Sequence, residues 1–253
     1  MNGRNYGFLL HNLVLRDFKL RYRNMSLGVF WSLLNPLVMM GVLWFIFTQF
    51  FQNQTKNFHV AVLSGLVVFN FFSLGWQSAT MSIHGNSGLI KRVPMPRELL
   101  PIATVLANGL HFLIQIGLLI GIALAAGYYP NVYWLLLPLL FGLEVVFVIG
   151  LCLITSALDV YFRDVRYVVE SANTVLFWLV PIFYSFSSVP AKYATLYMYN
   201  PVAAVVLACR SIIMDASLPP PSLLWKLPLV SAVLLALGIL VFGRLKRNFS
   251  DYL

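Results

Sequence analysis

The sequence predicts an all-α, polytopic membrane protein with six transmembrane helices, and three observations support that prediction. Of the 253 residues, 60% are hydrophobic and only 10% are charged. The mean hydropathy is +0.83, whereas a soluble domain carries about 25% charged residues and still exposes much of its surface. The third observation is a set of apolar runs of about 20 residues, the length that crosses the hydrocarbon core of a bilayer.

The N-terminal segment 1–27 is predicted to form an interfacial helix. Apolar side chains such as Phe8 and Leu13 alternate there with the charged residues Arg16, Lys19 and Arg21. A helix of this kind lies along the inner leaflet with its cations near anionic head groups. The alternative is a basic flank that only orients the first span. Because charged residues interrupt the segment, no removable signal peptide is expected.

Six apolar runs are predicted to cross the membrane, and together they make the whole chain one transmembrane domain. They cover residues 28–51, 60–83, 100–127, 133–158, 167–186 and 226–243. A seventh run, 201–214, is too short to cross and contains Arg210, which predicts a re-entrant or interfacial helix. Spans one to five therefore occupy 28–186, an external segment occupies 187–225, and span six with a cytoplasmic tail occupies 226–253.

The basic residues predict the orientation of these spans. With the N-terminus inside, thirteen of the 17 Lys and Arg residues fall on the cytoplasmic side, and four, Lys56, Lys192, Arg210 and Lys226, fall outside. The positive-inside rule then places both termini in the cytoplasm. Because the cations lie in short clusters between spans, the net charge of +9 is assigned to topology and not to nucleic-acid binding.

Three stretches, in order along the chain, resemble a known family. The first is RDFKLRYR at 16–23, followed by SLG at 26–28 and WSLLNP at 31–36. The second is LIKRVPMPRELLP at 89–101, and the third is YFRD at 161–164, followed by FY at 183–184 and YNP at 199–201. Together they resemble the permeases of ABC-2 type exporters, in particular those that export O-antigen, capsule and teichoic-acid polymers.

The resemblance implies an assembly with several partners. The chain would form a homodimer over two copies of a separate ATP-binding subunit, and its substrate would be a lipid-linked glycan surrounded by membrane lipids. ATP and Mg²⁺ would be bound by that subunit, so no cofactor is expected in this chain. Consistently, the sequence has no GxxxxGK[ST] phosphate loop. In the family, the external segment 187–225 forms helices that gate the exit.

The loop 84–99 is short, basic and bounded by prolines. The resemblance implies a coupling helix here that contacts the ATPase, and Arg97 and Glu98 carry charges suited to bonds across an interface. The candidate coupling residues are Lys91, Arg92, Pro94, Arg97 and Glu98. The loop after span four, with Arg163 and Asp164, is a second and smaller candidate. For both loops the alternative is an ordinary basic connection between spans.

Aromatic residues are candidates for the substrate path, because sugar rings stack their C–H faces on aromatic planes and related permeases are thought to line their channel in this way. The candidate residues are Trp76, Phe177, Trp178, Phe183, Tyr184 and Tyr197. A belt of aromatic residues at the membrane interface is the alternative.

Polar residues recur at helical spacing in spans two and three. Span two has Asn70, Ser73, Gln77, Thr80 and His84 on one face, and span three has Thr104, Asn108, His111 and Gln115. Such stripes bond the two spans of one hairpin to each other or form a translocation surface along a water-filled path. The GxxxG step formed by Gly117 and Gly121 predicts a packing notch.

Glu144 is the only acid deep within a span, at a depth comparable with that of His111. We expect a buried polar pair of His111 and Glu144, or a neutral, hydrogen-bonded Glu144. A proton relay is the alternative.

No enzymatic or metal site is predicted. Cys152 and Cys209 lie in apolar runs without a CxxC spacing, and no catalytic constellation or metal-ligand pattern appears. A membrane-embedded prenyl-phosphate enzyme would need paired acids or clusters of His and Arg. The sequence also leaves open two further functions, a drug or small-lipid exporter of the same superfamily and a structural membrane anchor.

Overall fold

The computed structural model describes residues 6–23, 25–50, 56–184, 192 and 200–252, and every regular element in these ranges is a helix. Five stretches are long and apolar enough to cross a membrane: Gly28–Gln49, Phe58–Thr80, Leu99–Ala125, Val132–Tyr161 and Pro221–Phe249. They correspond to five of the six predicted spans. The all-α prediction is therefore confirmed for the described part of the chain, and the sixth crossing stays a prediction.

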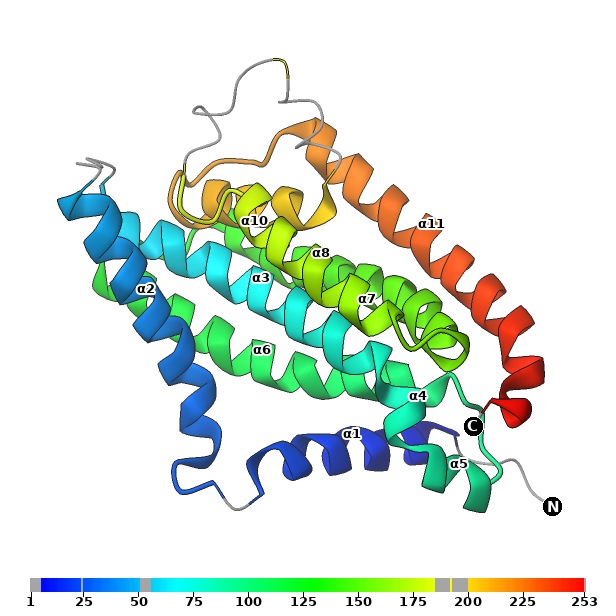
Figure 1. Ribbon diagram of the computed structural model, residues 1–253. Coiled ribbons are helices and arrows are strands. Elements are labelled where there is room, and N and C mark those ends of the chain that lie inside the picture. Colours follow the sequence, from blue (N-terminus) through cyan, green and yellow to red (C-terminus); the bar gives the residue numbers. More distant parts are fainter. Residues whose placement is uncertain (1–5, 24, 51–55, 185–191, 193–199, 253) are drawn as a thin grey trace.

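The helices of these stretches form a bundle around α3 (Figure 1). They are α2 (Trp31–Gln49, after the 3₁₀ turn η1, Gly28–Phe30), α3 (Phe58–Thr80), α6 (Leu99–Ala125), α7 (Leu137–Tyr161, after η2, Val132–Leu136) and α11 (Pro221–Leu245). Helix α3 is the most buried, because α2, α6, α7, α8 and α10 all pack against it. Helix α2 lies at the edge of the bundle.

Helix α8 (Val165–Leu179) is shorter than the predicted span 167–186. Its fifteen residues rise only about 22 Å. The helix ends because Val180 precedes Pro181, and a residue before proline is driven out of the helical region into extended conformation. The prediction of a continuous helix as far as residue 186 was therefore wrong at its outer end.

Helix α10 (Pro201–Ile213) corresponds to the predicted run 201–214 and is too short to cross. Asn200 caps it: its Oδ1 accepts hydrogen bonds from the backbone N–H groups of Val202 and Ala203, at 3.1 and 3.4 Å. Pro201 occupies the first helical position, where a missing N–H costs nothing. The helix is buried against α3 and α7, so it belongs to the bundle and does not lie on its surface.

Two glycines, neither of them in the predicted GxxxG step, set the closest helix contact. A Cβ added to Gly150 of α7 would lie 2.6 Å from the carbonyl carbon of Leu234 in α11, and Gly238 of α11 faces Gly150 in return. By contrast, a Cβ on Gly117 or Gly121 would meet no described atom within 4 Å. Within this chain, the predicted packing notch is therefore at the wrong glycines.

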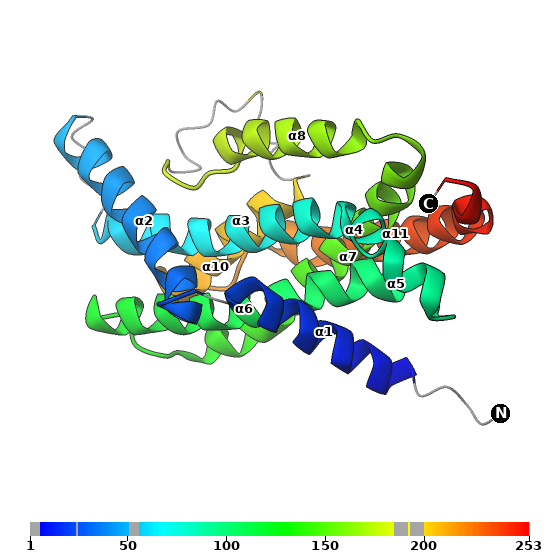
Figure 2. The same ribbon diagram turned by 60° about the horizontal axis from the view of Figure 1, so that its bottom comes forward.

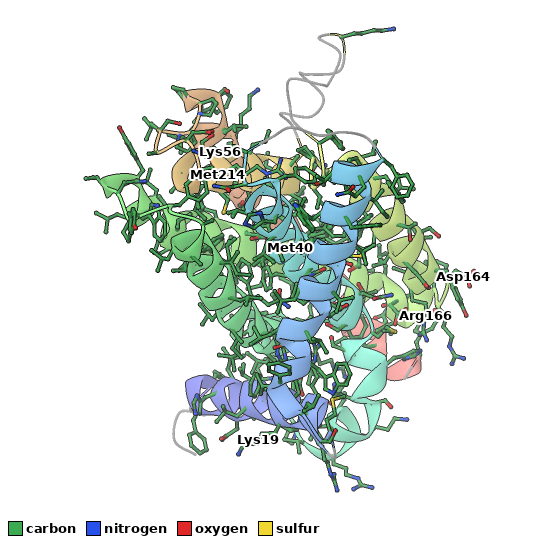
Figure 3. The ribbon with its side chains drawn as sticks, turned by 90° about the vertical axis from the view of Figure 1, so that its left-hand side faces the viewer. Lys19, Met40, Lys56, Asp164, Arg166 and Met214 are labelled. Atoms are coloured by element: carbon green, nitrogen blue, oxygen red, sulfur yellow. The ribbon has the colours of Figure 1, made fainter. Side chains whose placement is uncertain are left out.

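The helix α1 (Tyr6–Tyr22) lies across one end of the bundle, together with α4 (Ser82–Gly85), α5 (Ser87–Arg92) and the 3₁₀ turn η4 (Lys246–Asp251) (Figure 2). A second hydrophobic cluster joins these elements through Leu13, Ile83, Leu100, Leu153 and Phe249. The start of α1 and the end of α11 thus share one end, hereafter the basic end. Figure 3 shows Lys19 at this end and Lys56 at the opposite one. Which membrane face each end meets stays a prediction.

Candidate functional site

The predicted coupling loop forms two short helices and an extended link. Helix α4 ends at Gly85, α5 runs from Ser87 to Arg92, and Val93 is extended because Pro94 follows it. Three of the predicted coupling residues, Lys91, Arg92 and Pro94, are exposed at the tip. The loop therefore projects from the basic end with its cations outward, the arrangement that a docking partner requires.

The other two predicted residues of this loop contact the C-terminal turn of the same chain. Arg97 Nη1 donates to the carbonyl oxygen of Lys246 at 3.0 Å, and its guanidinium carbon lies 5.7 Å from the ring centroid of Phe249. Glu98 Oε1 lies 3.0 Å from Lys246 Nζ. Any contact of Arg97 and Glu98 with an ATPase would compete with these bonds. The turn η4 was not predicted, since a six-residue segment has no periodicity to read.

The second predicted loop lies beside the first. Arg163 and Asp164 are exposed, and Arg163 and Arg166 face a hollow of about 480 Å³. The remaining lining residues come from α4, α5 and the C-terminal end: Met81, His84, Gly85, Ser87 and Tyr252. Arg166 Nε is held 3.4 Å from Oδ1 of the buried Asp159. The structure thus brings both predicted coupling loops to one surface.

Helix α1 is bonded to this surface through two residues of the RDF motif. Arg16 Nη2 contacts Asp17 Oδ1 at 2.7 Å and donates to Asn86 Oδ1 at 2.8 Å. Asp17 Oδ2 in turn accepts from Thr104 Oγ1 of α6 at 3.0 Å. Burial lowers the pKa of the nearby Arg21 guanidinium, and its neighbours, including Asp17, oppose that shift. The sequence pattern indicated an interfacial helix but not these bonds.

The predicted pair of His111 and Glu144 is not formed. His111 faces α1, where its Nδ1 is hydrogen-bonded to the Tyr22 hydroxyl and its ring stacks on Phe18 with centroids 4.9 Å apart. Glu144 is 1% exposed, and neither carboxylate oxygen has a hydrogen-bond partner among the described residues. Its electrostatic neighbour is Cys209 of α10. The prediction failed because equal depth does not place two side chains on facing sides of their helices.

The polar stripes mostly bond helices to one another. Thr80 and Thr155 link α3 to α7 through hydroxyls 2.8 Å apart. Asn108 Nδ2 donates to Ser78 Oγ of α3 at 2.9 Å, and Gln115 Nε2 donates to the carbonyl of Ser32 at 3.0 Å. Of these contacts, only that of Asn108 joins spans two and three as predicted. Thr80 and Gln115 bond to α7 and α2 instead. Ser73 and Gln77 instead line a hollow, described below.

Four of the predicted path aromatics lie together at the end of α8 and in the segment that follows it. The ring of Phe183 lies 5.4 Å from Trp178, 5.4 Å from Tyr184 and 6.0 Å from Phe177, centroid to centroid. Phe47 of α2 joins them at 5.2 Å. Trp76 is elsewhere, buried against Phe72 inside the bundle, and Tyr197 lies outside the described residues.

Arg210 holds this aromatic cluster in place. Its guanidinium donates to the carbonyl oxygens of Ala61, Tyr184 and Ile182, at 2.9, 3.2 and 2.5 Å. The segment can lie this close to α3 because position 65 is glycine: a Cβ there would be 3.0 Å from the Cα of Ile182. The sequence indicated that Arg210 disfavours a crossing helix, but not that it organises the turn after α8.

Comparison with known proteins adds to this geometry. The sequence profile of the family described as ABC-2 type transporter matches residues 9–214. The chain belongs to the ABC-2 type transporter family. It is 30% identical over 255 residues to the O-antigen export system permease protein RfbA of Klebsiella pneumoniae, covering 98% of this chain and 97% of that protein. It is 29% identical to the RfbA permease of Myxococcus xanthus, covering 97% and 95% of the two chains. It is 25% identical to the polysialic acid transport protein KpsM of Escherichia coli, covering 91% of this chain and 90% of that protein.

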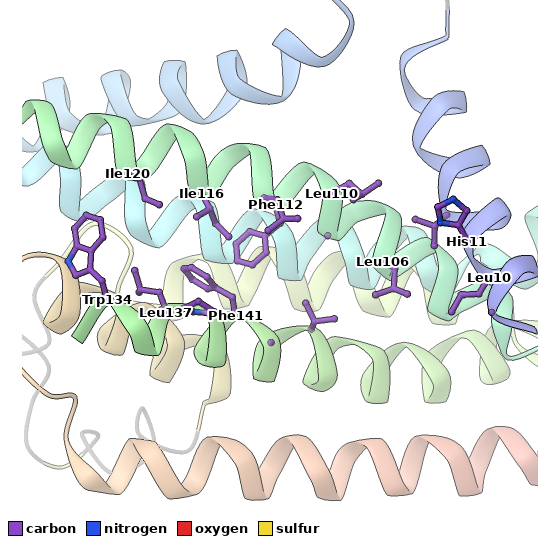
Figure 4. A pocket seen from close by; sticks show the side chains of 17 residues that line it. Leu10, His11, Leu106, Leu110, Phe112, Ile116, Ile120, Trp134, Leu137 and Phe141 are labelled. Carbon is purple, nitrogen blue, oxygen red and sulfur yellow. The ribbon is translucent and has the colours of Figure 1, made fainter. Parts of the chain in front are cut away.

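Two hollows along the helices of this ABC-2 type transporter differ in chemistry. A groove of about 730 Å³ between α1, α6 and α7 is lined almost entirely by apolar side chains, with His11 at its α1 end (Figure 4). A pocket of about 330 Å³ lies between α2, α3 and α8 and has polar and aromatic walls. It is lined by Met39, Phe69, Ser73, Gln77, Glu170, Asn173, Thr174 and Phe177. The groove suits a hydrocarbon chain, whereas the pocket suits a hydroxylated ligand.

Proposed function

We propose that this chain is the membrane-spanning subunit of an exporter that moves a lipid-linked polysaccharide, such as an O-antigen, across the inner membrane of a bacterium. The observation that carries the proposal is the end-to-end similarity to O-antigen export permeases, which covers 98% of this chain. ATP hydrolysis would occur in a separate subunit, which binds ATP and Mg²⁺. The pocket and the aromatic cluster on the α3–α8 side support a sugar as the transported group.

We further propose a homodimer in which the edge of the bundle at α2 meets a second copy. Only 11% of the α2 span is buried within the chain, against 78% of the α3 span. Its exposed side chains include Trp31, Val38, Val42 and Phe45. Lipid could cover such a surface. A second copy, however, would place the pocket between α2, α3 and α8 of each chain around one shared path for the substrate. Helix α8 and the turn after it would then serve as the sixth crossing.

The basic end is proposed to face the cytoplasm and to bind two ATPase copies, one under each chain. Its exposed cations at Arg92 and Arg163 support this orientation under the positive-inside rule. Helix α5 would insert into the ATPase, and the hollow beside Arg163 would complete the contact. Both termini are then cytoplasmic, and α10 lies toward the outside.

Deleting the gene tests the proposed function. Finished lipid-linked polymer is expected to accumulate on the inner face of the membrane, while the cell surface loses polymer. Expression of this chain should restore the surface polymer only in cells that retain the ATPase. An absent or shortened internal polymer would indicate an assembly enzyme, and an unchanged surface would indicate an exporter of drugs or small lipids.

A further inference from the structure

The pocket between α3 and α8 places polar groups where a membrane helix would normally be apolar. Ser73 and Gln77 lie one helical turn apart on α3, and Glu170 and Asn173 lie one turn apart on α8. Polar and ionisable side chains within membrane helices are costly to keep there, and they mark either helix contacts or a transported ligand. The bonds made by each group decide between these roles.

Asn173 identifies the pocket as a binding site. Its side chain is 7% exposed, yet neither Nδ2 nor Oδ1 has a hydrogen-bond partner among the described residues. Leaving a buried amide unpaired is unfavourable, and such groups are rare in folded proteins. Asn108 provides the contrast: it is 2% exposed and its Oδ1 also has no described partner, but its Nδ2 donates to Ser78 Oγ at 2.9 Å and to the Thr104 carbonyl at 2.8 Å. Asn108 joins helices, whereas Asn173 presents its amide to the pocket.

The pocket lies in the half of the bundle next to the basic end. Asn173 is eight residues into α8, about 12 Å along its axis from Val165. Phe177 is one turn farther and lines the outer edge of the pocket. The Phe177 ring also contacts Phe69, Trp178 and Phe183, with centroids 5.4, 5.5 and 6.0 Å apart. Phe177 therefore belongs both to the pocket and to the aromatic cluster.

The combination of groups matches one class of ligand. A sugar ring presents hydroxyl groups at its edge, which amides and carboxylates bind, and C–H faces, which aromatic rings cover. The volume of about 330 Å³ is at the lower end of the range for ligand pockets, about 300–1,000 Å³, and so suits a short segment and not a folded polymer. Glu170 is the only charged group among the described lining residues, so an anionic sugar would be repelled.

We infer that this pocket binds a neutral glycosyl unit of the transported polymer, with Asn173, Gln77 and Glu170 bonded to its hydroxyls and Phe69 and Phe177 against its ring. The inference rests on the proposed function and adds the site and the charge of the sugar. It assigns α8 a direct role in substrate recognition.

Asn173→Leu tests the inference, because stability and binding should respond differently. Leucine keeps the branched shape at Cγ and replaces an amide that has no described partner, so the melting temperature should stay the same or rise. The probe is an oligosaccharide released by mild acid from the cells' own surface polymer and labelled at its reducing end. Its affinity for the permease–ATPase complex in lipid nanodiscs should fall about tenfold, as expected for one lost hydrogen bond.

Glu170→Gln should raise the affinity for an acidic oligosaccharide.

Asn108→Leu is the matched control and should lower the melting temperature, since it removes two bonds within the bundle. If Asn173→Leu lowers the melting temperature as much, or dissociates the dimer, the amide is structural and the inference fails. Unchanged affinity of Asn173→Leu for the probe, or of Glu170→Gln for the acidic oligosaccharide, would also overturn it. A failure of the proposed function is distinguishable, because the wild-type complex would then neither bind the probe nor restore surface polymer.

Discussion

Lys246 Nζ lies 3.0 Å from Glu98 Oε1, so the last helix of the chain is bonded to the loop that precedes α6. The adjacent Arg97 binds the backbone of the same lysine at 3.0 Å. A force applied to this predicted coupling loop would therefore act on α6 and α11 together. The first prediction follows from this pair.

Glu98→Lys should detach η4 from the loop, because it places two cations side by side. The pair is partly exposed, so we expect a loss of stability below about 1 kcal/mol. The effect on coupling should be larger, seen as ATP hydrolysis that no longer responds to polymer. The exchange Glu98→Lys with Lys246→Glu restores opposite charges and should recover the response. Failure of the exchange to recover any response would show that the pair does not link the loop to α11.

Reversing the charge of Arg92 should weaken ATPase binding. Arg92 is exposed at the end of α5, so Arg92→Glu leaves the fold intact. A charge reversed within an interface costs about 2 kcal/mol or more, which corresponds to roughly 30-fold weaker binding. The amount of ATPase that co-purifies with the permease measures this loss of binding. Lys56→Glu makes the same change at the opposite end and should have no effect; equal ATPase recovery in both variants would count against docking at α5.

Arg210→Met should destabilise the protein strongly. It removes the donor that satisfies the carbonyls of Ala61, Ile182 and Tyr184, and each buried acceptor left unpaired costs about 1–3 kcal/mol. We expect a loss of at least about 3 kcal/mol and a change in the fluorescence of the nearby Trp178. Thermal unfolding in detergent measures the first effect. Arg210→Lys keeps a cation but not the planar set of guanidinium donors, so its melting temperature should lie between those of the wild type and Arg210→Met. A wild-type melting temperature for Arg210→Met would contradict the assignment.

Glu144→Leu should not lower stability, because the carboxyl has no hydrogen-bond partner among the described residues. Tyr22→Phe should cost about 1 kcal/mol, because it removes the hydroxyl bonded to His111. Chemical denaturation of both variants in the same detergent gives the comparison. A clear loss of stability in Glu144→Leu would mean that the acid has a partner in the assembled transporter.

Reporter fusions test the orientation. A reporter after Leu253 should be active only in the cytoplasm, and one inserted within 216–222 only outside, because the basic end holds the exposed cations of α5 and Arg163. Activity of the C-terminal fusion outside the inner membrane would reverse the proposed orientation.

The sequence was sufficient for features that depend on composition and length. Apolar runs of about 20 residues correctly located five helices, because a continuous apolar segment of that length satisfies its own backbone in lipid by forming a helix. The fifth predicted span extended too far along the chain, because the apolar run continues past Pro181 whereas the helix already ends at Leu179, before the extended Val180. Residues 91, 92 and 94 are exposed, as their position in a basic, proline-bounded loop indicated, and their role in coupling stays a prediction.

Features that depend on the rotation of one helix against another could not be predicted. His111 and Glu144 share a depth but face different neighbours, α1 and α10. Ser73 and Gln77 looked the same as Thr80 in the stripe of span two. Only the position of α8 shows that the first two line a pocket while Thr80 bonds to Thr155.

The contact between Gly150 and Gly238 has a mechanical consequence. Where most helix pairs are separated by a layer of side chains that can change rotamer, α7 and α11 meet through their backbones. Sliding α7 along α11 would bring Leu234 against the α7 backbone. We therefore expect the two helices to resist sliding and to move as one rigid unit. Because the Tyr161 hydroxyl also donates to the Leu245 carbonyl at 2.7 Å, α7 and α11 are bonded again at the basic end. A displacement that begins at η4 would thus be transmitted along α11 and α7 together.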